Sequence, residues 1–183
     1  MNRPDVRARE VAGRVSATAR RGAEVGVWRG EMSAQMLRLM PDLTLYMIDP
    51  WAPASGTYAA TKDPRARDDA ADMLQAMAAA EAAVEFAGER VRIIRDFSHR
   101  AVNRIAPQSL DFAFIDADHS CEAVRRDIAM WRTNVKPGGL LCGHDYGMWE
   151  DRGFGVRMAV DEAVAAHGWT LALGEDSTWF VTV

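Results

Sequence analysis

Several features that define other classes of protein are scarce or absent in this sequence. Two cysteines, Cys121 and Cys142, are too few for a disulfide framework, so we expect both to be reduced thiols. No stretch approaches the roughly 18 consecutive apolar residues of a membrane span, and the N-terminus has no apolar secretory signal. These absences predict a cytoplasmic protein without a membrane partner.

An excess of positive charge is absent as well. The formal net charge is −4, which argues against the dense basic face that binds duplex nucleic acid. The N-terminal segment is rich in arginine and poor in acids, like a transit peptide, but an amphipathic helix with a solvated arginine face explains it equally well. We therefore expect no nucleic-acid partner. The sequence leaves the oligomeric state open, a homo-oligomer included.

What the sequence does contain is a regular alternation of helical and strand patterns. The 183 residues suffice for one domain with a core, so we expect 1–183 to form a single domain with a lead-in helix within 1–21. The predicted helices are 5–20, 30–40, 65–87, 98–105, 120–133 and 156–167, and the predicted strands are 22–27, 43–48, 91–95, 110–116, 140–144, 169–174 and 177–183. This alternation predicts an α/β fold whose parallel sheet is covered on both faces and ends in an antiparallel hairpin.

The stretch EVGVWRG, residues 24–30, ends the first predicted strand, where open α/β sheets bind ligands. The spacing of Gly26 and Gly30 is wrong for the dinucleotide fingerprint, and the Gly-Lys-Ser/Thr of a phosphate loop is missing. Glycines let a ligand approach the backbone, the helix N-terminus receives a carboxylate, and Glu24 takes a cation or a hydroxyl. A ligand with an ammonium, a carboxylate and a ribose fits better than a pyrophosphate.

A second acid, Asp49, ends the second predicted strand. It follows the glycine loop by about 20 residues, where a carboxylate grips the ribose hydroxyls of a nucleoside. Acids at this position serve nucleoside cofactors with and without pyrophosphate. Asp49 therefore predicts a bound nucleoside and does not by itself say which one.

The combination of this loop with Asp49 resembles the class I S-adenosylmethionine-dependent methyltransferases over residues 20–183. The blocks IDADHSCEAVRRDIAMW (115–131), VKPGGLLCGHDYG (135–147) and GVRMAVDEAV (155–164) resemble the methyltransferase family that includes the macrocin O-methyltransferase and cephalosporin-biosynthesis types. The resemblance implies a Rossmann-like three-layer sandwich with a seven-stranded mixed sheet, strand order 3-2-1-4-5-7-6 and strand 7 antiparallel. It also implies a small-molecule acceptor and S-adenosylmethionine as the cofactor, bound by Glu24, Gly26, Gly30 and Asp49.

The segment RDFS, residues 95–98, follows the third predicted strand, where the resemblance places groups that contact adenine. Asp96 supplies an acid for the exocyclic amine, Phe97 an apolar neighbour for the ring, and Ser98 a hydroxyl. The alternative is that Asp96 or Ser98 caps the helix that follows.

Asp116 and Asp118 close the fourth predicted strand. A pair of carboxylates there is costly unless it meets hydrogen-bond donors or a cation, and the cation is either the cofactor's own sulfonium or ammonium, or a metal. Asp118 has the alternative of capping the helix at Ser120. The resemblance implies that Asp116 also binds a divalent metal, with further ligands after the fifth strand at His144 and Asp145.

Related sequences often carry two acids or Asp-Asn after the fifth strand, whereas this chain has a histidine first. Because imidazole suits softer ions than Mg²⁺, the set Asp116, His144 and Asp145 predicts a divalent metal that is either Mg²⁺ or softer. A metal at Asp116 and Asp145 would lower the pKa of an acceptor hydroxyl, and His144 or His119 would deprotonate it. The alternatives are that His119 bonds to the backbone at the helix start and that His144 supports Asp116.

Two predicted loops, 51–64 and 146–155, carry aromatic residues that either line an acceptor pocket or cover the cofactor: Trp51, Tyr58, Trp149 and Phe154. The sequence as a whole predicts an enzyme that transfers a methyl group from S-adenosylmethionine to a hydroxyl of a small molecule, assisted by a divalent metal. The alternatives are an NAD-dependent oxidoreductase on a similar fold and a non-catalytic S-adenosylmethionine-binding module.

Overall fold

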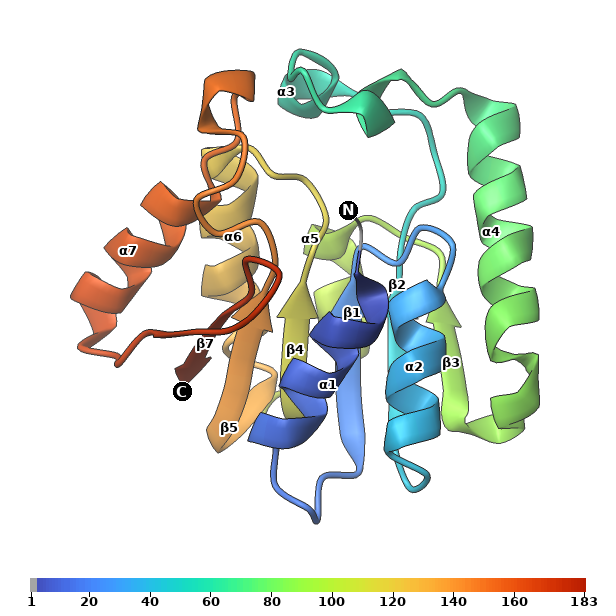
Figure 1. Ribbon diagram of the computed structural model, residues 1–183, viewed down its shortest axis with the longest axis vertical. Coiled ribbons are helices and arrows are strands. Elements are labelled where there is room, and N and C mark those ends of the chain that lie inside the picture. Colours follow the sequence, from blue (N-terminus) through green and yellow to red (C-terminus); the bar gives the residue numbers. More distant parts are fainter. Residues whose placement is uncertain (1–2) are drawn as a thin grey trace.

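Seven strands form one sheet in the computed structural model, which describes residues 3–183 (Figure 1). The strands are β1 (Arg21–Val25), β2 (Thr44–Ile48), β3 (Val91–Ile94), β4 (Leu110–Ile115), β5 (Val135–Gly143), β6 (Ala172–Leu173) and β7 (Trp179–Thr182). Their order is β3-β2-β1-β4-β5-β7-β6. Strands β1 to β5 are parallel, and β7 is antiparallel to both β5 and β6. The predicted α/β class, strand order and antiparallel seventh strand are confirmed.

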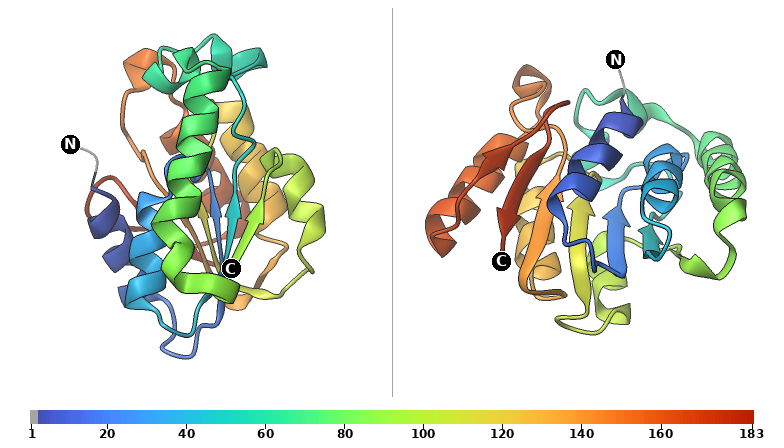
Figure 2. Two further views of the ribbon diagram at one scale, coloured as in Figure 1. Left: turned by 90° about the vertical axis from the view of Figure 1, so that its right-hand side faces the viewer. Right: turned by 60° about the horizontal axis from the view of Figure 1, so that its bottom comes forward.

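Helices cover both faces of this sheet, as Figure 2 shows. They are α1 (Pro4–Arg14), α2 (Glu31–Leu39), α3 (Gly56–Ala59), α4 (Ala70–Val84), α5 (Ser98–Ala101), α6 (Cys121–Trp131) and α7 (Val156–His167), with 3-10 turns η1 (Pro64–Arg67), η2 (Glu85–Arg90), η3 (Val102–Arg104) and η4 (Glu150–Arg152). None of the helices between residues 3 and 183 combines the length and apolarity that crossing a membrane requires.

Two hydrophobic clusters fill the space between the sheet and its helices, one on each face. Phe112 and Phe114 of β4 pack with α1, α2 and α4, whereas Ala113 and Ile115 of the same strand pack with α5, α6 and α7. Alternate residues of a strand point to opposite faces, so a strand that is buried on both sides needs an almost continuous apolar run such as LDFAFI. The predicted three-layer sandwich is confirmed.

The N-terminal helix is shorter than the predicted 5–20 because it ends at Arg14. Beyond it, the Ser16 hydroxyl accepts the N–H of Thr18 at 3.2 Å, and local bonds of this kind compete with helix formation. Helix α1 begins at the edge where the parallel strands end and packs on α2 (Figure 1). Its first half therefore lies beside the loops that follow the strands.

The long helix predicted at 65–87 begins only at Ala70. Asp69 accepts the N–H of Asp72 at 3.0 Å and donates its own N–H to the Asp72 carboxylate at 3.0 Å, which is a reciprocal capping box. The turn predicted at 136–139 lies within β5, whose register against β4 shifts there. The first difference leaves η1 and residues 68–69 in the loop before α4.

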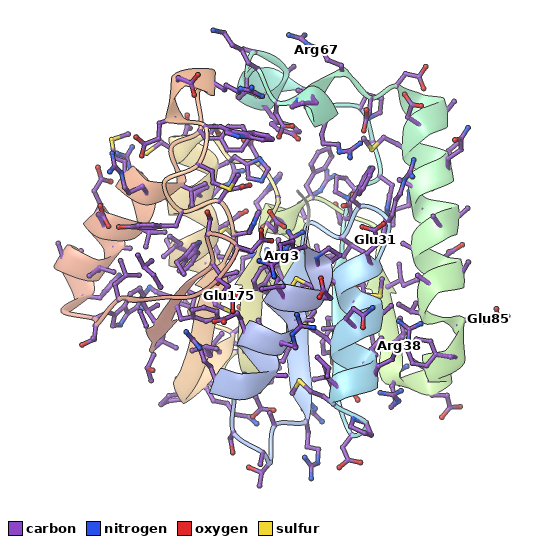
Figure 3. All side chains as sticks on the ribbon, in the orientation of Figure 1. Arg3, Glu31, Arg38, Arg67, Glu85 and Glu175 are labelled. Atoms are coloured by element: carbon purple, nitrogen blue, oxygen red, sulfur yellow. The ribbon has the colours of Figure 1, made fainter. Side chains whose placement is uncertain are left out.

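The turn between β6 and β7 returns to the same edge as the start of α1. Asp176 and Ser177 have positive φ angles of 53° and 54°, so the turn is tight and left-handed. Glu175 lies 3.5 Å from the Arg3 guanidinium, and Figure 3 labels both side chains. Two segments from opposite ends of the chain thus meet at the ligand edge.

Candidate functional site

The strand ends open into a cavity of about 920 Å³. Loops that follow β1 to β5 line it, together with α1 and the β6–β7 turn. Most of the predicted site residues lie on its wall: Glu24, Gly26, Asp49, Phe97, Ser98, Asp116, His119, His144 and Asp145. Gly30 and Asp96 are the two predicted residues that are not among its lining residues.

The β1 end places Glu24 and Gly26 on one side of the cavity. Glu24 is 3% exposed, and the Ser33 hydroxyl of α2 donates a hydrogen bond to its carboxylate. Burial raises the pKa of Glu24 to about 8, because removing the carboxylate from water disfavours its charge. Gly26 has a φ of 92°, and a Cβ there would lie 2.0 Å from the Asp116 carbonyl oxygen. The loop therefore needs glycine at this position.

Asp49 organises the loops after β1 and β2. Its carboxylate accepts the backbone N–H groups of Val27, Trp28 and Trp51 at 3.0, 2.9 and 2.7 Å. Burial raises the pKa of Asp49, and these three bonds oppose that rise. The predicted ribose acid thus also fixes the backbone around the ligand.

Gly30 serves helix packing rather than the cavity wall. Its φ is 72° at the start of α2, and a Cβ there would come within 2.9 Å of the Ala80 Cα on α4. The close approach of these two helices therefore requires a residue without a side chain at position 30.

The three predicted residues after β3 differ in where they lie: Phe97 and Ser98 line the cavity, and Asp96 does not. Asp96 accepts the N–H of Phe97 at 2.8 Å and pairs with Arg100 at 2.6 Å. Neither contact caps the first turn of α5, whose N-cap residue is Phe97. Ser98 faces the cavity and donates to the buried Asp127 carboxylate at 2.7 Å. Burial raises the pKa of Asp127 to about 6. Asp127 of α6, which was not among the predicted site residues, thus lies at the Ser98 end of the cavity.

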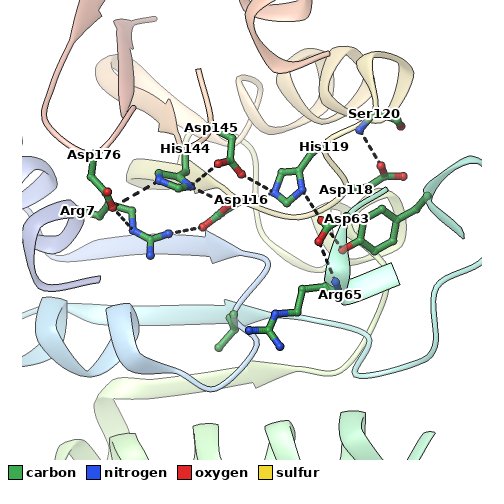
Figure 4. A network of polar contacts seen from close by, with 12 residues as sticks. Arg7, Asp63, Arg65, Asp116, Asp118, His119, Ser120, His144, Asp145 and Asp176 are labelled. Atoms are coloured by element: carbon green, nitrogen blue, oxygen red, sulfur yellow. Dashed lines mark hydrogen bonds and ion pairs between the residues drawn. The ribbon is translucent and has the colours of Figure 1, made fainter. Parts of the chain in front are cut away.

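The loops after β4 and β5 bring four predicted residues into one cluster, shown in Figure 4. His119 Nε2 lies 3.0 Å from Asp145 Oδ2 and 3.3 Å from Asp116 Oδ1. His144 Nδ1 lies 3.1 Å from Asp145 Oδ1 and 3.7 Å from Asp116 Oδ1. Asp118 instead accepts the N–H of Ser120, the N-cap residue of α6, at 2.9 Å.

Three further residues complete this cluster and were missed by the sequence analysis. Asp63, from the loop before η1, lies 3.0 Å from His119 Nδ1. Asp176, from the β6–β7 turn, lies 3.5 Å from His144 Nε2. Arg7 of α1 donates from Nη1 to Asp116 Oδ2 at 2.8 Å.

A helical pattern did contain a signal for Arg7. It lies four positions before Val11 and beside Ala8, on the stripe that α1 buries, whereas a solvated arginine belongs on the opposite face. Asp63 and Asp176 gave no such signal, because an aspartate before proline or in a hairpin turn is ordinary turn chemistry.

The cluster holds its histidines in the charged form. Burial alone would lower the pKa of His119, but hydrogen bonds with Asp116, Asp145 and Asp63 outweigh it and hold the pKa well above its usual value. For His144, burial again opposes the charge, and the nearby carboxylate of Asp116 raises the pKa to about 9. Three cations, Arg7 and the two histidines, therefore face four carboxylates.

The same cluster contains a set of side chains that fits a divalent metal. One ligand atom each from Asp116, His144 and Asp145 lies within 4.8 Å of the others. Two carboxylates and one imidazole suit ions from Mn²⁺ to Zn²⁺ better than Mg²⁺, which prefers oxygen ligands only. Because an imidazole must lose its proton to bind a metal, binding here would displace the proton of His144.

An aromatic wall faces the cluster. His119 stacks on Phe154 with ring centroids 4.4 Å apart, and Trp149 packs against Phe154 at 5.5 Å. Tyr58 meets the edge of His119 at 6.4 Å. Of the four predicted loop aromatics, Trp51 alone is not a lining residue: it is 2% exposed, and its indole N–H donates to the backbone.

Residues 23–146 match a family model described as a methyltransferase domain. The matched span contains the loop after β1, Asp49, and the cluster residues from Asp116 to Asp145. It leaves out α1 and the β6–β7 turn, which supply Arg7 and Asp176. No curated protein is detectably similar to the chain in sequence.

Solved structures share the fold at low sequence identity. A protein from Corynebacterium glutamicum is 16% identical with a TM-score of 0.68, over 100% of this chain and 81% of that one. A Staphylococcus aureus protein assigned as a caffeoyl-CoA O-methyltransferase is 17% identical with a TM-score of 0.66, over 98% and 82%. The O-methyltransferase NovP is 16% identical with a TM-score of 0.65, over 96% and 77%. These likenesses show the fold alone.

Proposed function

The chain belongs to the methyltransferase-domain family, and we propose that it transfers a methyl group from S-adenosylmethionine to a hydroxyl of a small-molecule acceptor. One observation carries the proposal: a single cavity joins the Glu24, Gly26 and Asp49 side to the acid–histidine cluster of Asp116 and Asp145. One side has the groups for a nucleoside that bears an amino acid. The other side has the groups that bind a hydroxyl.

S-adenosylmethionine supplies a sulfonium methyl group, and the chain supplies alignment. Glu24 receives the ammonium of the amino-acid part, and its buried carboxyl ionises when that cation arrives. Gly26 lets the backbone approach, Asp49 faces the ribose, and Phe97 and Ser98 face the adenine. The loops that carry Tyr58 and Phe154 exclude water from the line between donor and acceptor.

On the acceptor side, Asp116, His144 and Asp145 are the residues that would hold a divalent metal, which polarises a bound hydroxyl when present. Both ring N–H groups of His119 face carboxylates, Nδ1 facing Asp63 and Nε2 facing Asp116 and Asp145. In this arrangement His119 positions those carboxylates beside the acceptor. A base role for His119 or His144 requires that ring to give up its proton first.

Measurements of cofactor binding and of turnover distinguish this function from an NAD-dependent oxidoreductase and from a non-catalytic binding module. We expect isothermal titration to show binding of S-adenosylhomocysteine and none of NAD, and a panel of phenols, catechols and sugar hydroxyls to yield S-adenosylhomocysteine from S-adenosylmethionine. NAD binding without S-adenosylhomocysteine binding would establish an oxidoreductase instead. Cofactor binding with no turnover on any acceptor would favour a non-catalytic module.

Metal dependence is tested separately. We expect Asp145→Ala to lose stoichiometric Mn²⁺ or Zn²⁺ measured by metal analysis after dialysis, because it removes one of three ligands. Asp42→Ala, which removes an exposed carboxylate, is the matched control. If chelation leaves both the metal content and the activity of the unaltered enzyme unchanged, the metal role of this cluster is wrong.

A further inference from the structure

Arg7 lines the cavity but has no role in the function proposed above. We propose that the Arg7 guanidinium binds the carboxylate of the cofactor's methionyl group. This inference rests on the proposed function and adds a binding residue from outside the matched family span of 23–146.

Arg7 is built into the cavity wall. It is 6% exposed and lies on α1, between Pro4 on the rim and the packed residues Ala8 and Val11. Its Nη1 lies 2.8 Å from Asp116 Oδ2, and its Nε lies 3.3 Å from Asp176 Oδ2. The guanidinium is therefore held from two directions.

A cation at this place suits the chemistry of the methionyl group, in addition to the helix N-terminus that the sequence assigns to its carboxylate. Its ammonium and carboxylate share one carbon, so a site that receives the ammonium at Glu24 and Asp116 brings the carboxylate beside the same two acids. Without a positive charge there, the carboxylate would be repelled. A guanidinium presents its N–H donors in a planar fork that matches a carboxylate.

Three other arginines lie on the cavity wall. Arg65 stacks on Trp28 with its guanidinium carbon 3.4 Å from the ring centroid, Arg100 pairs with Asp96, and the charge of Arg126 acts on Asp127 at the Ser98 end of the cavity. Arg7 is the arginine in contact with Asp116, the acid where the cofactor side meets the acceptor side.

The two oxygens of Asp116 separate these sides. Oδ2 receives Arg7, whereas Oδ1 faces His119 and His144 (Figure 4). A carboxylate bound by Arg7 would therefore lie on the Oδ2 side of Asp116, whereas the imidazoles face Oδ1. The alternative is that Arg7 only balances the charge of Asp116 and Asp176, and the test below distinguishes the two.

The test compares ligands that differ in the methionyl carboxylate. Isothermal titration would measure S-adenosylhomocysteine, decarboxylated S-adenosylmethionine and 5′-methylthioadenosine against the full-length chain and Arg7→Met, which keeps an unbranched apolar stem. We expect Arg7→Met to weaken S-adenosylhomocysteine by roughly tenfold to a hundredfold, as for a hydrogen bond between charged groups. The two ligands without a carboxylate should change by about twofold or less, and Arg7→Lys should restore part of the loss.

Arg9→Met, on the exposed face of the same helix, is the matched control and should leave all three affinities unchanged. An equal loss for all three ligands in Arg7→Met, or no loss for S-adenosylhomocysteine, would overturn the inference and assign Arg7 a structural role. If Arg7→Met does not fold, the affinities of the same three ligands are compared between the wild type and Arg7→Lys. A wild-type chain that does not bind S-adenosylhomocysteine would instead overturn the proposed function.

Discussion

Glu24 shows at the scale of one residue how burial sets the charge of an acid. Its pKa rises from 4.5 to about 8 in the folded chain, so the folded state holds a proton that the unfolded state releases. The folded state therefore binds more protons between pH 4.5 and 8. Its stability falls as pH rises through that window and is highest below it.

We expect Glu24→Gln to remove this pH dependence, since glutamine does not titrate. The free energy of unfolding of the wild type, measured by urea titration, should fall by a few kcal/mol between pH 5 and 8 relative to the variant. Glu81→Gln, at an exposed position of α4, is the control and should follow the wild type. Parallel curves for wild type and Glu24→Gln would show that Glu24 is already ionised in the folded state.

Single residues mark the limit of what the sequence predicted. Glu24, Gly26 and Asp116 were predictable because each directly follows or ends a strand, and parallel strands bring their ends to one edge. Arg7 and Asp176 were not selected. The apolar stripe of α1 indicates that Arg7 is buried, but its partner Asp116 lies more than a hundred positions away, and no local pattern encodes that contact or the packing of the last turn.

At the scale of elements, two loops close over the cluster from opposite sides. The loop that contains α3 and η1 brings Tyr58 and Asp63 to His119, and the loop around η4 brings Phe154 onto the same ring. The backbone of Lys62 also donates to the Arg152 carbonyl at 3.1 Å, which joins the loops directly. In the proposed function, segments outside the regular layers would thus hold the acceptor.

We expect Phe154→Ala to raise the KM for the acceptor several-fold while the Kd for S-adenosylhomocysteine stays the same, because Phe154 stacks on His119 on the acceptor side. Steady-state kinetics with an acceptor found in the panel, together with titration of the cofactor product, measures both. Met158→Ala on the exposed face of α7 is the control. A loss of cofactor affinity in Phe154→Ala would place this loop over the cofactor instead.

Elements differed in how well the sequence defined them. The apolar runs predict β1 to β4 to within two residues at each end, because a strand covered on both faces must be apolar throughout, whereas β5 begins five residues before its predicted start. The composition of segment 65–69 suits a helix, but the capping box at Asp69 shows that the helix begins later. Propensity alone does not resolve such a boundary.

At the scale of the whole molecule, the cavity predicts how ligands change stability. We expect S-adenosylhomocysteine at a hundred times its Kd to stabilise the folded state by about 2.7 kcal/mol, and each kcal/mol to raise Tm by about 2–4 °C for a chain of this size. Thermal unfolding followed by circular dichroism measures the shift. NAD at the same concentration should leave Tm unchanged, and an equal shift with NAD would contradict the assignment of the cofactor.

The layer order and the place of the cavity follow from topology. A parallel sheet with right-handed crossovers puts the strand ends, and hence the ligand, at one edge, so both were predictable from the alternation of helices and strands. The identity of the acceptor was not predictable, because in the proposed function its binding surface would come from loops whose shape depends on their mutual contact.

In the proposed function Asp116 belongs to two binding sites at once, since one of its oxygens meets the guanidinium of Arg7 on α1 and the other faces the imidazoles of His119 and His144. Occupancy on either side changes the electrostatic field that the other side experiences. Thermodynamic reciprocity then requires that a metal ion alter the affinity for the cofactor by the same factor as the cofactor alters the affinity for the ion. The order of loading affects the route to the ternary complex and leaves its final free energy unchanged.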